Sequence, residues 1–234
     1  MSRCDGRHDL PAGPRGGFTL LEILVAIFIF AIVITTVFGS FRAVFFSADA
    51  VGSDVAVFQN ARTCLDRMAR DLGALYITDY PRYRKPEFND PPDIYRVVGD
   101  TTDVAGKNFS RLRFTSLAHL ALHGDSRRGV CRVVYYVHQG RDDSLVLRRA
   151  DHLYPFPEFE ENDDDPILCD KLLGLEFSYG EADEETTGAW DSESADNDYA
   201  TPHTVTVRLT VGQPSRPITF TTRIPLHVYR KTAE

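Results

Sequence analysis

A single carboxylate at the start of a long apolar segment is the feature of this sequence with the clearest chemical consequence. Glu22 closes the stretch Arg15-Gly16-Gly17-Phe18-Thr19-Leu20-Leu21-Glu22, and residues 23–41 after it carry no charged side chain. An acidic side chain inside a bilayer costs roughly 2–3 kcal/mol or more, so such residues usually have a function. The chemistry that Glu22 offers is a charge pair with a cationic group in surroundings of low dielectric constant.

The apolar segment has the length of a membrane span. At about 1.5 Å per residue, residues 23–41 reach roughly 28 Å as a helix, close to the thickness of the bilayer core. Arg42 ends the segment, and three arginines precede it at positions 3, 7 and 15. Because basic residues flank the cytoplasmic side of a span, we expect the residues before the segment in the cytoplasm and those after Arg42 outside.

The residues around the start of this segment resemble the processing site of type IV pilins and of their secretion-system relatives, the pseudopilins. The resemblance lies in the short polar leader, the Gly17-Phe18 junction and the glutamate four residues later. It implies that a prepilin peptidase cuts between Gly17 and Phe18 and methylates the new N-terminal Phe18. It also gives Glu22 an assembly role, in which the carboxylate meets the N-terminal amine of a neighbouring subunit.

Two other interpretations of the segment compete with this one. A plain single-pass anchor has no need of Glu22 and is weakened by it. A secretory signal cut after Ala48-Asp49-Ala50 makes Val51 the first mature residue. The acid at the start of the apolar region and the length of the region argue against such a signal, so the pilin-type interpretation is favoured.

Composition and charge exclude other classes. With 43% hydrophobic and 26% charged residues the chain is expected to fold. Its formal net charge of −8, without a basic cluster, argues against a nucleic-acid partner, because nothing neutralises a run of phosphates.

The helix is predicted to continue beyond Arg42 to about Tyr76, because no proline interrupts it. One face of this second half is apolar, with Val51, Val55, Phe58, Leu65, Met68, Leu72 and Leu75. The opposite face is polar, with Asp54, Arg62, Asp66, Arg67, Arg70 and Asp71. Such a stripe predicts packing against a sheet.

The rest of the chain indicates antiparallel sheet. Four prolines, at positions 81, 86, 91 and 92, rule out a continuous helix after Thr78. Alternating apolar and polar residues predict strands over 111–115, 130–137, 145–148, 173–179, 205–211 and 218–224. A polar turn at 140–143 predicts a hairpin. The expected fold class is therefore α+β, with a leader at 1–17, a membrane and assembly helix at 18–42, an amphipathic helix at 43–77 and an antiparallel β domain at 78–234.

The second half of the chain is similar to the J-type minor pseudopilins of type II secretion. The similarity is carried by residues 172–179 (LLGLEFSY), by Gly188-Ala189-Trp190, by residues 202–207, by the hairpin over 132–149 and by the helix end at 65–72. Those proteins often carry a second tryptophan, whereas Trp190 is the only one here, with Tyr199 nearby. A minor pilin of a type IV pilus stays open as an alternative.

No set of residues predicts catalysis or a metal centre. His119 and His123 lack the glutamate of a zinc-protease helix, and no cysteine pair has zinc spacing. Three acidic runs, at 158–165, 181–185 and 191–198, indicate solvated loops, with calcium as the alternative. Cys4 lies in the leader, and Cys131 with Cys169 is the expected disulfide because both lie in strand-like segments.

Together these features predict a minor pseudopilin that is not an enzyme. The resemblance implies an inner-membrane protein with its C-terminal domain in the periplasm. It implies prepilin peptidase, other major and minor pseudopilins and the inner-membrane assembly platform as partners, with exported proteins as further candidates. A rival class is a membrane-anchored periplasmic enzyme that uses the acidic loops. Another is a carbohydrate-binding module that uses Trp190.

Overall fold

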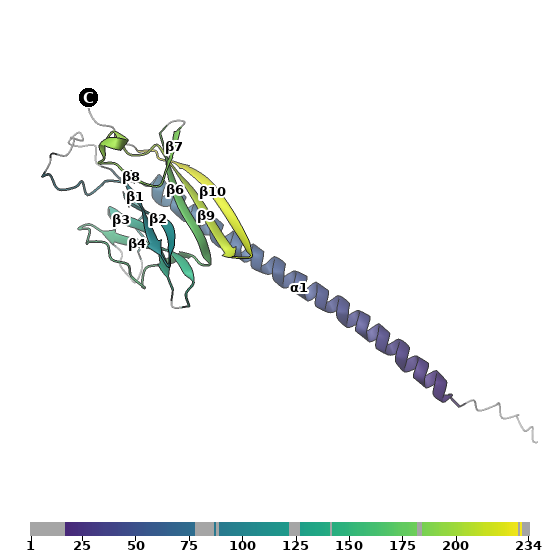
Figure 1. The fold of residues 1–234 in the computed structure, drawn as a ribbon. Helices are drawn as coiled ribbons and strands as arrows, with labels where there is room; N and C mark the ends of the chain where they lie inside the picture. The colour runs from purple at the N-terminus through teal and green to yellow at the C-terminus, as the bar shows by residue number, and fades with distance from the viewer. Residues whose placement is uncertain are drawn as a thin grey trace, which may run out of the picture. The chain divides into compact units, whose positions relative to one another are not determined.

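The computed structural model describes residues 17–77, 87, 89–121, 127–140, 142–181, 184–228 and 230, without the side chains of 43–54 and 181–187. By its internal contacts the chain divides into two compact units, Met1–Gly52 and Ser53–Glu234. One helix, α1 (Leu20–Gly73), contributes to both units, and every strand described belongs to the second (Figure 1).

In the first unit, α1 begins at a threonine cap. The hydroxyl of Thr19 accepts a hydrogen bond of 3.2 Å from the backbone N–H of Glu22, which satisfies one of the free donors of the first turn. Farther along, the hydroxyls of Thr35, Thr36 and Ser40 donate to backbone carbonyls three or four residues earlier. These three hydroxyls therefore find their partners within the helix itself.

The second unit contains two antiparallel sheets. The six-stranded sheet has the order β5-β4-β3-β2-β1-β8, and the four-stranded sheet has the order β10-β9-β6-β7. The strands of the first are β1 (Val98–Val104), β2 (Lys107–Ser116), β3 (Cys131–Gln139), β4 (Leu145–Leu153), β5 (Ile167–Cys169) and β8 (Trp190–Asp191). Those of the second are β6 (Leu172–Glu181), β7 (Glu184–Thr187), β9 (Thr204–Gln213) and β10 (Arg216–Pro225).

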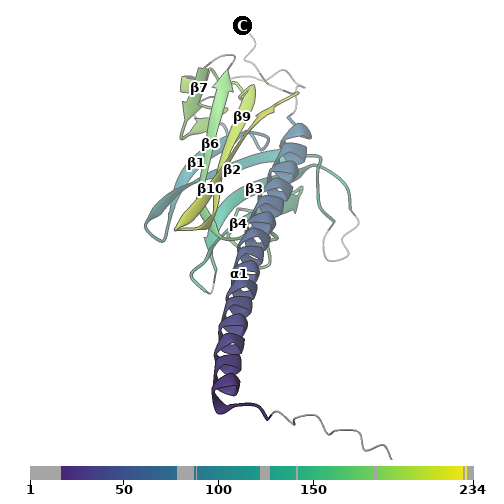
Figure 2. The same cartoon turned by 90° about the vertical axis from the view of Figure 1, so that its right-hand side faces the viewer.

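One hydrophobic core joins the two sheets to the last turns of α1. Alternate residues of β3 and β9, such as Val133, Tyr135, Val205 and Val207, are buried in it. Gly99 on β1 lets the sheets approach closely, because a Cβ there would lie 1.7 Å from the hydroxyl oxygen of Tyr179 on β6. Figure 2 shows the second half of α1 lying along the strands of the larger sheet.

The predicted fold class is confirmed: one long helix packs with antiparallel sheets in an α+β arrangement. The predicted hairpin is also present, because β3 and β4 pair from Cys131↔Leu153 to Gln139↔Leu145. The helix ends earlier than predicted, at Gly73 instead of near Tyr76. Leu75 has already left it to form a β-bridge with Ser116.

The buried stripe of α1 differs from the predicted one. Ala61, Cys64, Met68 and Leu72 are its buried members, whereas Val55 and Phe58, predicted to be apolar contacts, are about half exposed. Asp71 was wrongly assigned to the polar face: its side chain is fully buried. The apolar pattern missed the small residues at 61 and 64 and could not foresee a buried charge.

Asp71 is buried because cations and a hydroxyl surround it. Its carboxylate accepts hydrogen bonds from Arg149 Nε at 2.7 Å, from Arg67 Nη2 at 2.5 Å and from the hydroxyl of Tyr135. Arg149 is also fully buried, and it donates to Asp151 Oδ2 at 2.5 Å and to the carbonyl of Ala118 at 3.1 Å. This network links α1 to β3, to β4 and to the segment after β2.

The pKa shifts in this network follow from burial and pairing. Burial alone lowers the pKa of Arg149, but the hydrogen bond and charge of Asp71 outweigh it and raise that pKa. Burial, followed by the charge of Asp71, raises the pKa of Tyr135 well above its usual range. Burial tends to raise the pKa of Asp151, and the charge of Arg149 overcomes this and lowers it. The arginine therefore stays charged and the tyrosine neutral.

We predict that Asp71→Asn destabilises the full-length protein by about 3–5 kcal/mol, because it removes one of the two carboxylates that pair with the buried Arg149 cation. Denaturant unfolding in detergent measures the loss. Asp66→Asn is the matched control, since Asp66 pairs with Arg62 at 3.9 Å on the exposed side of the same helix and is expected to cost under about 0.5 kcal/mol. Equal losses in the two variants would contradict this interpretation.

Candidate assembly site

The three residues with predicted roles lie at the start of α1. Gly17 and Phe18 precede the helix, and Phe18 is 80% exposed. Glu22 is in the first helical turn, where the free backbone N–H groups and the helix dipole favour a negative charge. Among the described residues, no group donates a hydrogen bond to its carboxylate. The residues before Gly17, which make up the rest of the predicted leader, lie outside the described part of the chain.

The helix that follows presents apolar side chains all round. Its stretch Leu20–Arg42 is long enough and apolar enough to cross a membrane. Large side chains such as Leu24, Ile27, Phe30 and Phe38 are exposed along it. An apolar surface of this extent has to be covered by lipid or by other apolar helices, since monomeric soluble proteins rarely expose one. Together with Glu22, this surface can anchor the protein in a membrane and pack against equivalent helices.

The cysteines do not pair as the sequence predicted. Cys131 and Cys169 are both free and buried. Cys131 lies opposite Leu153 and Cys169 opposite Leu147, on the two sides of β4. The six residue steps along β4 from Leu147 to Leu153 correspond to about 20 Å of strand, whereas a disulfide needs Cα atoms within about 7 Å. The expected bridge is therefore wrong. The neighbour of Cys169 is Cys64, which is likewise free and buried and whose thiol lowers the pKa of Cys169.

The structure brings His119 together with Cys131 and Asp151, a combination that resembles the parts of a cysteine-dependent active site or metal centre. His119 Nδ1 lies 2.8 Å from Asp151 Oδ1, and the three residues have ligand atoms within 4.8 Å of one another. However, Cys131 is fully buried, and burial together with the charge of Asp151 raises its pKa to about 12. A buried thiol that keeps its proton is a poor nucleophile. His123, the other predicted histidine, lies outside the described residues.

The first acidic run lies across the outer face of β3 and β4 and is paired there. His138 contacts Glu161 at 2.9 Å and Asp163 at 3.1 Å, and the Tyr136 hydroxyl donates to Asp165 at 2.9 Å. In the third run, Asp191 and Glu193 pair with Arg96. The side chains of 181–185 lie outside the described part. Calcium binding by these runs stays an untested alternative.

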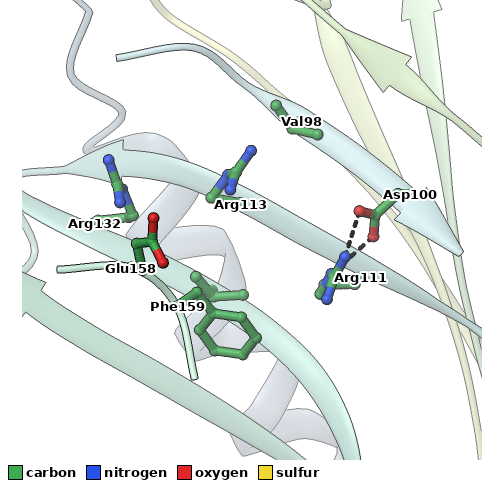
Figure 3. Close-up of a pocket in the computed structure, with 8 residues that line it drawn as sticks. Val98, Asp100, Arg111, Arg113, Arg132, Glu158 and Phe159 are labelled. Carbon is green, nitrogen blue, oxygen red and sulfur yellow. Dashed lines mark hydrogen bonds and ion pairs between the residues drawn. The ribbon is translucent and has the colours of Figure 1, made fainter. Parts of the chain in front are cut away.

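A hollow of the second unit lies on the same outer face, beside β1, β2 and β3, and has a volume of about 380 Å³ (Figure 3). Three arginines line it: Arg111, which pairs with Asp100, and Arg113 and Arg132. Burial, followed by the neighbouring Arg96, lowers the pKa of Arg113. The lining combines these cationic hydrogen-bond donors with the carboxylates of Asp100 and Glu158, and contains no thiol, hydroxyl or imidazole.

Trp190 cannot serve as a carbohydrate platform. Its side chain is buried, its ring packs 5.8 Å from that of Tyr179, and its indole N–H donates to the carbonyl of Ala200 at 3.1 Å. Carbohydrate recognition through this residue needs an exposed ring face, so that alternative was wrong. Trp190 instead fills the core where β8 pairs with β1.

Comparison with known proteins agrees with the site at the start of α1. Residues 14–38 match the family described as "Prokaryotic N-terminal methylation motif". No curated protein matches the chain. The matched segment contains the Gly17-Phe18 junction and Glu22, and it supports a type IV pilin-like protein processed by a prepilin peptidase.

The sequence-based prediction did not identify one residue of this site, Thr19. Thr19 caps α1, and the pattern Thr19-Leu20-Leu21-Glu22 has the spacing of a capping box. That pattern was available in the sequence as a signal for the first helical residue. It places the start of the helix directly after the predicted cleavage site.

Proposed function

We propose that this chain is a J-type minor pseudopilin of a type II secretion system. Its processed form lies in the inner membrane, with the β domain in the periplasm, and joins other pseudopilins near the tip of a short periplasmic filament. The observation that carries the proposal is the Gly17-Phe18 junction with Glu22 at the start of an exposed apolar helix, inside a matched methylation motif. The similarity of the β domain to J-type subunits supports the finer assignment.

The chemical step is performed on this protein and not by it. Hydrolysis of the Gly17–Phe18 peptide bond releases the leader and leaves a cationic amine on Phe18, which the peptidase then methylates. This amine lies one residue before the Thr19 cap, so cleavage leaves the helix start intact. The carboxylate of Glu22 can then pair with the cationic N-terminal amine of Phe18 on the next subunit.

Assembly follows from the apolar surface of α1. In the membrane this surface is covered by lipid, and in the filament it is covered by the equivalent helices of neighbours. Apolar contacts alone fix no axial position, because one turn of such a helix resembles the next. An ion pair between Glu22 and the neighbouring N-terminus selects one position, since every other position leaves two charges unpaired in apolar surroundings. Export of folded proteins is driven by the assembly platform on which such filaments grow.

We predict that Glu22→Ala and Glu22→Gln are both cleaved after Gly17 but enter filaments about tenfold less than the wild type, or worse, because the N-terminal amine loses its partner. Intact mass measures cleavage, and the subunit content of sheared filaments measures incorporation. Thr35→Val is the matched control, since the Thr35 hydroxyl bonds only within its own helix. Wild-type incorporation of both Glu22 variants would refute the assembly role.

We further predict that the cross-linked, full-length protein co-purifies with the other minor pseudopilins of its secretion system. The type IV pilus alternative makes a different prediction, namely recovery of pilus subunits in their place. Mass spectrometry of the cross-linked complex separates the two. Cross-linking in cells that carry Gly17→Val, in which the leader is retained, should lose these partners and serves as the control.

A further inference from the structure

Two cysteines that are distant in the sequence meet in the core of the second unit. Cys64 lies on α1, and Cys169 is the last residue of β5. Both side chains are buried, and they lie close enough that the Cys64 thiol lowers the pKa of Cys169. Both belong to the one core cluster that joins the helix to the sheets.

The surrounding contacts hold this pair in place. Asn60, one turn before Cys64, donates from its side-chain amide to Asp170 Oδ1 at 2.9 Å, and Asp170 directly follows Cys169. On the strand side, Cys169 is opposite Leu147 of β4. On the helix side, Cys64 lies between the buried Ala61 and Met68. These contacts therefore hold the α1 backbone near Cys64 and the β5 backbone near Cys169 in place.

We propose that Cys64 and Cys169 form a disulfide in the mature protein. This inference rests on the proposed function to the extent that an exported β domain folds in an oxidising compartment, where disulfides persist. The oxidant is the disulfide of a dithiol oxidoreductase of that compartment. One cysteine thiolate attacks this disulfide and forms a mixed disulfide. The second cysteine then attacks the bound cysteine sulfur and expels the donor, which leaves as a dithiol with the two electrons and two protons.

The surroundings of the three described cysteines favour this pair. The neighbouring Cys64 thiol lowers the pKa of Cys169, so Cys169 is the better attacking thiolate. Burial raises the pKa of Cys131, which is fully enclosed and has Ser116 and Asp151 as neighbours instead of a second cysteine. Cys131 is therefore left as a reduced thiol.

The position of β5 gives the oxidant a route to the pair. β5 is a three-residue strand at the edge of its sheet, and it pairs only with β4. Short edge strands open locally at little cost in free energy. Opening of β5 exposes Cys169 to the oxidant, both during folding and after α1 has packed on the sheets. Once formed, the bridge joins α1 covalently to the sheet, about two turns before the Asp71 network.

The test uses the full-length protein, isolated from its native envelope with free thiols blocked by alkylation before unfolding. Peptide mapping without reduction should show the segments of Cys64 and Cys169 linked, with Cys131 alkylated. Cys131→Ser should keep the link, whereas Cys64→Ser and Cys169→Ser should each release the other cysteine for alkylation. Reduction should lower the melting midpoint of the wild type by about 10 °C and leave that of Cys64→Ser unchanged.

The state of the leader in the same sample separates this inference from the proposed function. Free Cys64 and Cys169 in protein that begins at Phe18 overturn the bridge and leave the proposed function standing. A bridge in protein that keeps its leader supports the disulfide and overturns the proposed function. Purified protein in an equimolar buffer of reduced and oxidised glutathione gives an independent measure. If Cys64 and Cys169 form no disulfide in this glutathione buffer, the proposed bridge is also overturned.

Discussion

The buried charge pair between Asp71 and Arg149 fixes how α1 packs on the sheets, and the core depends on that position. Removing two charges from water is costly, and their attraction together with good hydrogen bonds is needed to offset it. Here every oxygen of Asp71 has a donor, and Arg149 has further acceptors at Asp151 and Ala118. Such a pair adds little net stability compared with an apolar core. Its contribution is that one register of α1 on the sheets is much lower in free energy than the adjacent registers.

A shift of α1 by one turn shows why. It would carry an apolar residue such as Met68 to the place of Asp71 and leave the buried Arg149 with only one of its two carboxylate partners, Asp151. The same shift would separate Cys64 from Cys169 and Asn60 from Asp170. Polar contacts at several points along the second half of α1 therefore specify one arrangement. The apolar stripe from Ala61 to Leu72 supplies the burial that drives docking.

The two parts of α1 meet different surroundings and show different chemistry. After Ser53 the helix buries a stripe of small and apolar residues against the sheets of its own unit. Before Gly52 its exposed apolar side chains have no cover among the described residues of the monomer, and its hydroxyls bond within the helix. Glu22 is the single acid of the membrane-spanning stretch Leu20–Arg42. Its charge has a physical rationale once a cationic chain end is available nearby.

Sequence reasoning predicted what depends on local pattern. The apolar run, the Gly17-Phe18-Glu22 spacing, the alternating strands and the polar turn at 140–143 all lie within short windows. It missed what depends on tertiary neighbours. Asp71 looks like any other polar helix residue until Arg149 is brought opposite it. The strand-like segments around Cys131 and Cys169 suggested a disulfide between them, because nothing in the sequence shows that β4 lies between the two strands. Trp190 among acidic residues looked exposed, yet β8 carries it into the core.

Tandem mass spectrometry of the N-terminal peptide, from protein extracted from its native envelope, tests the central claim most directly. The account predicts one N-terminus, an N-methylated Phe18, with no peptide from residues 1–17 still attached. An unmethylated chain that retains its leader, or one that begins at Val51, would contradict it.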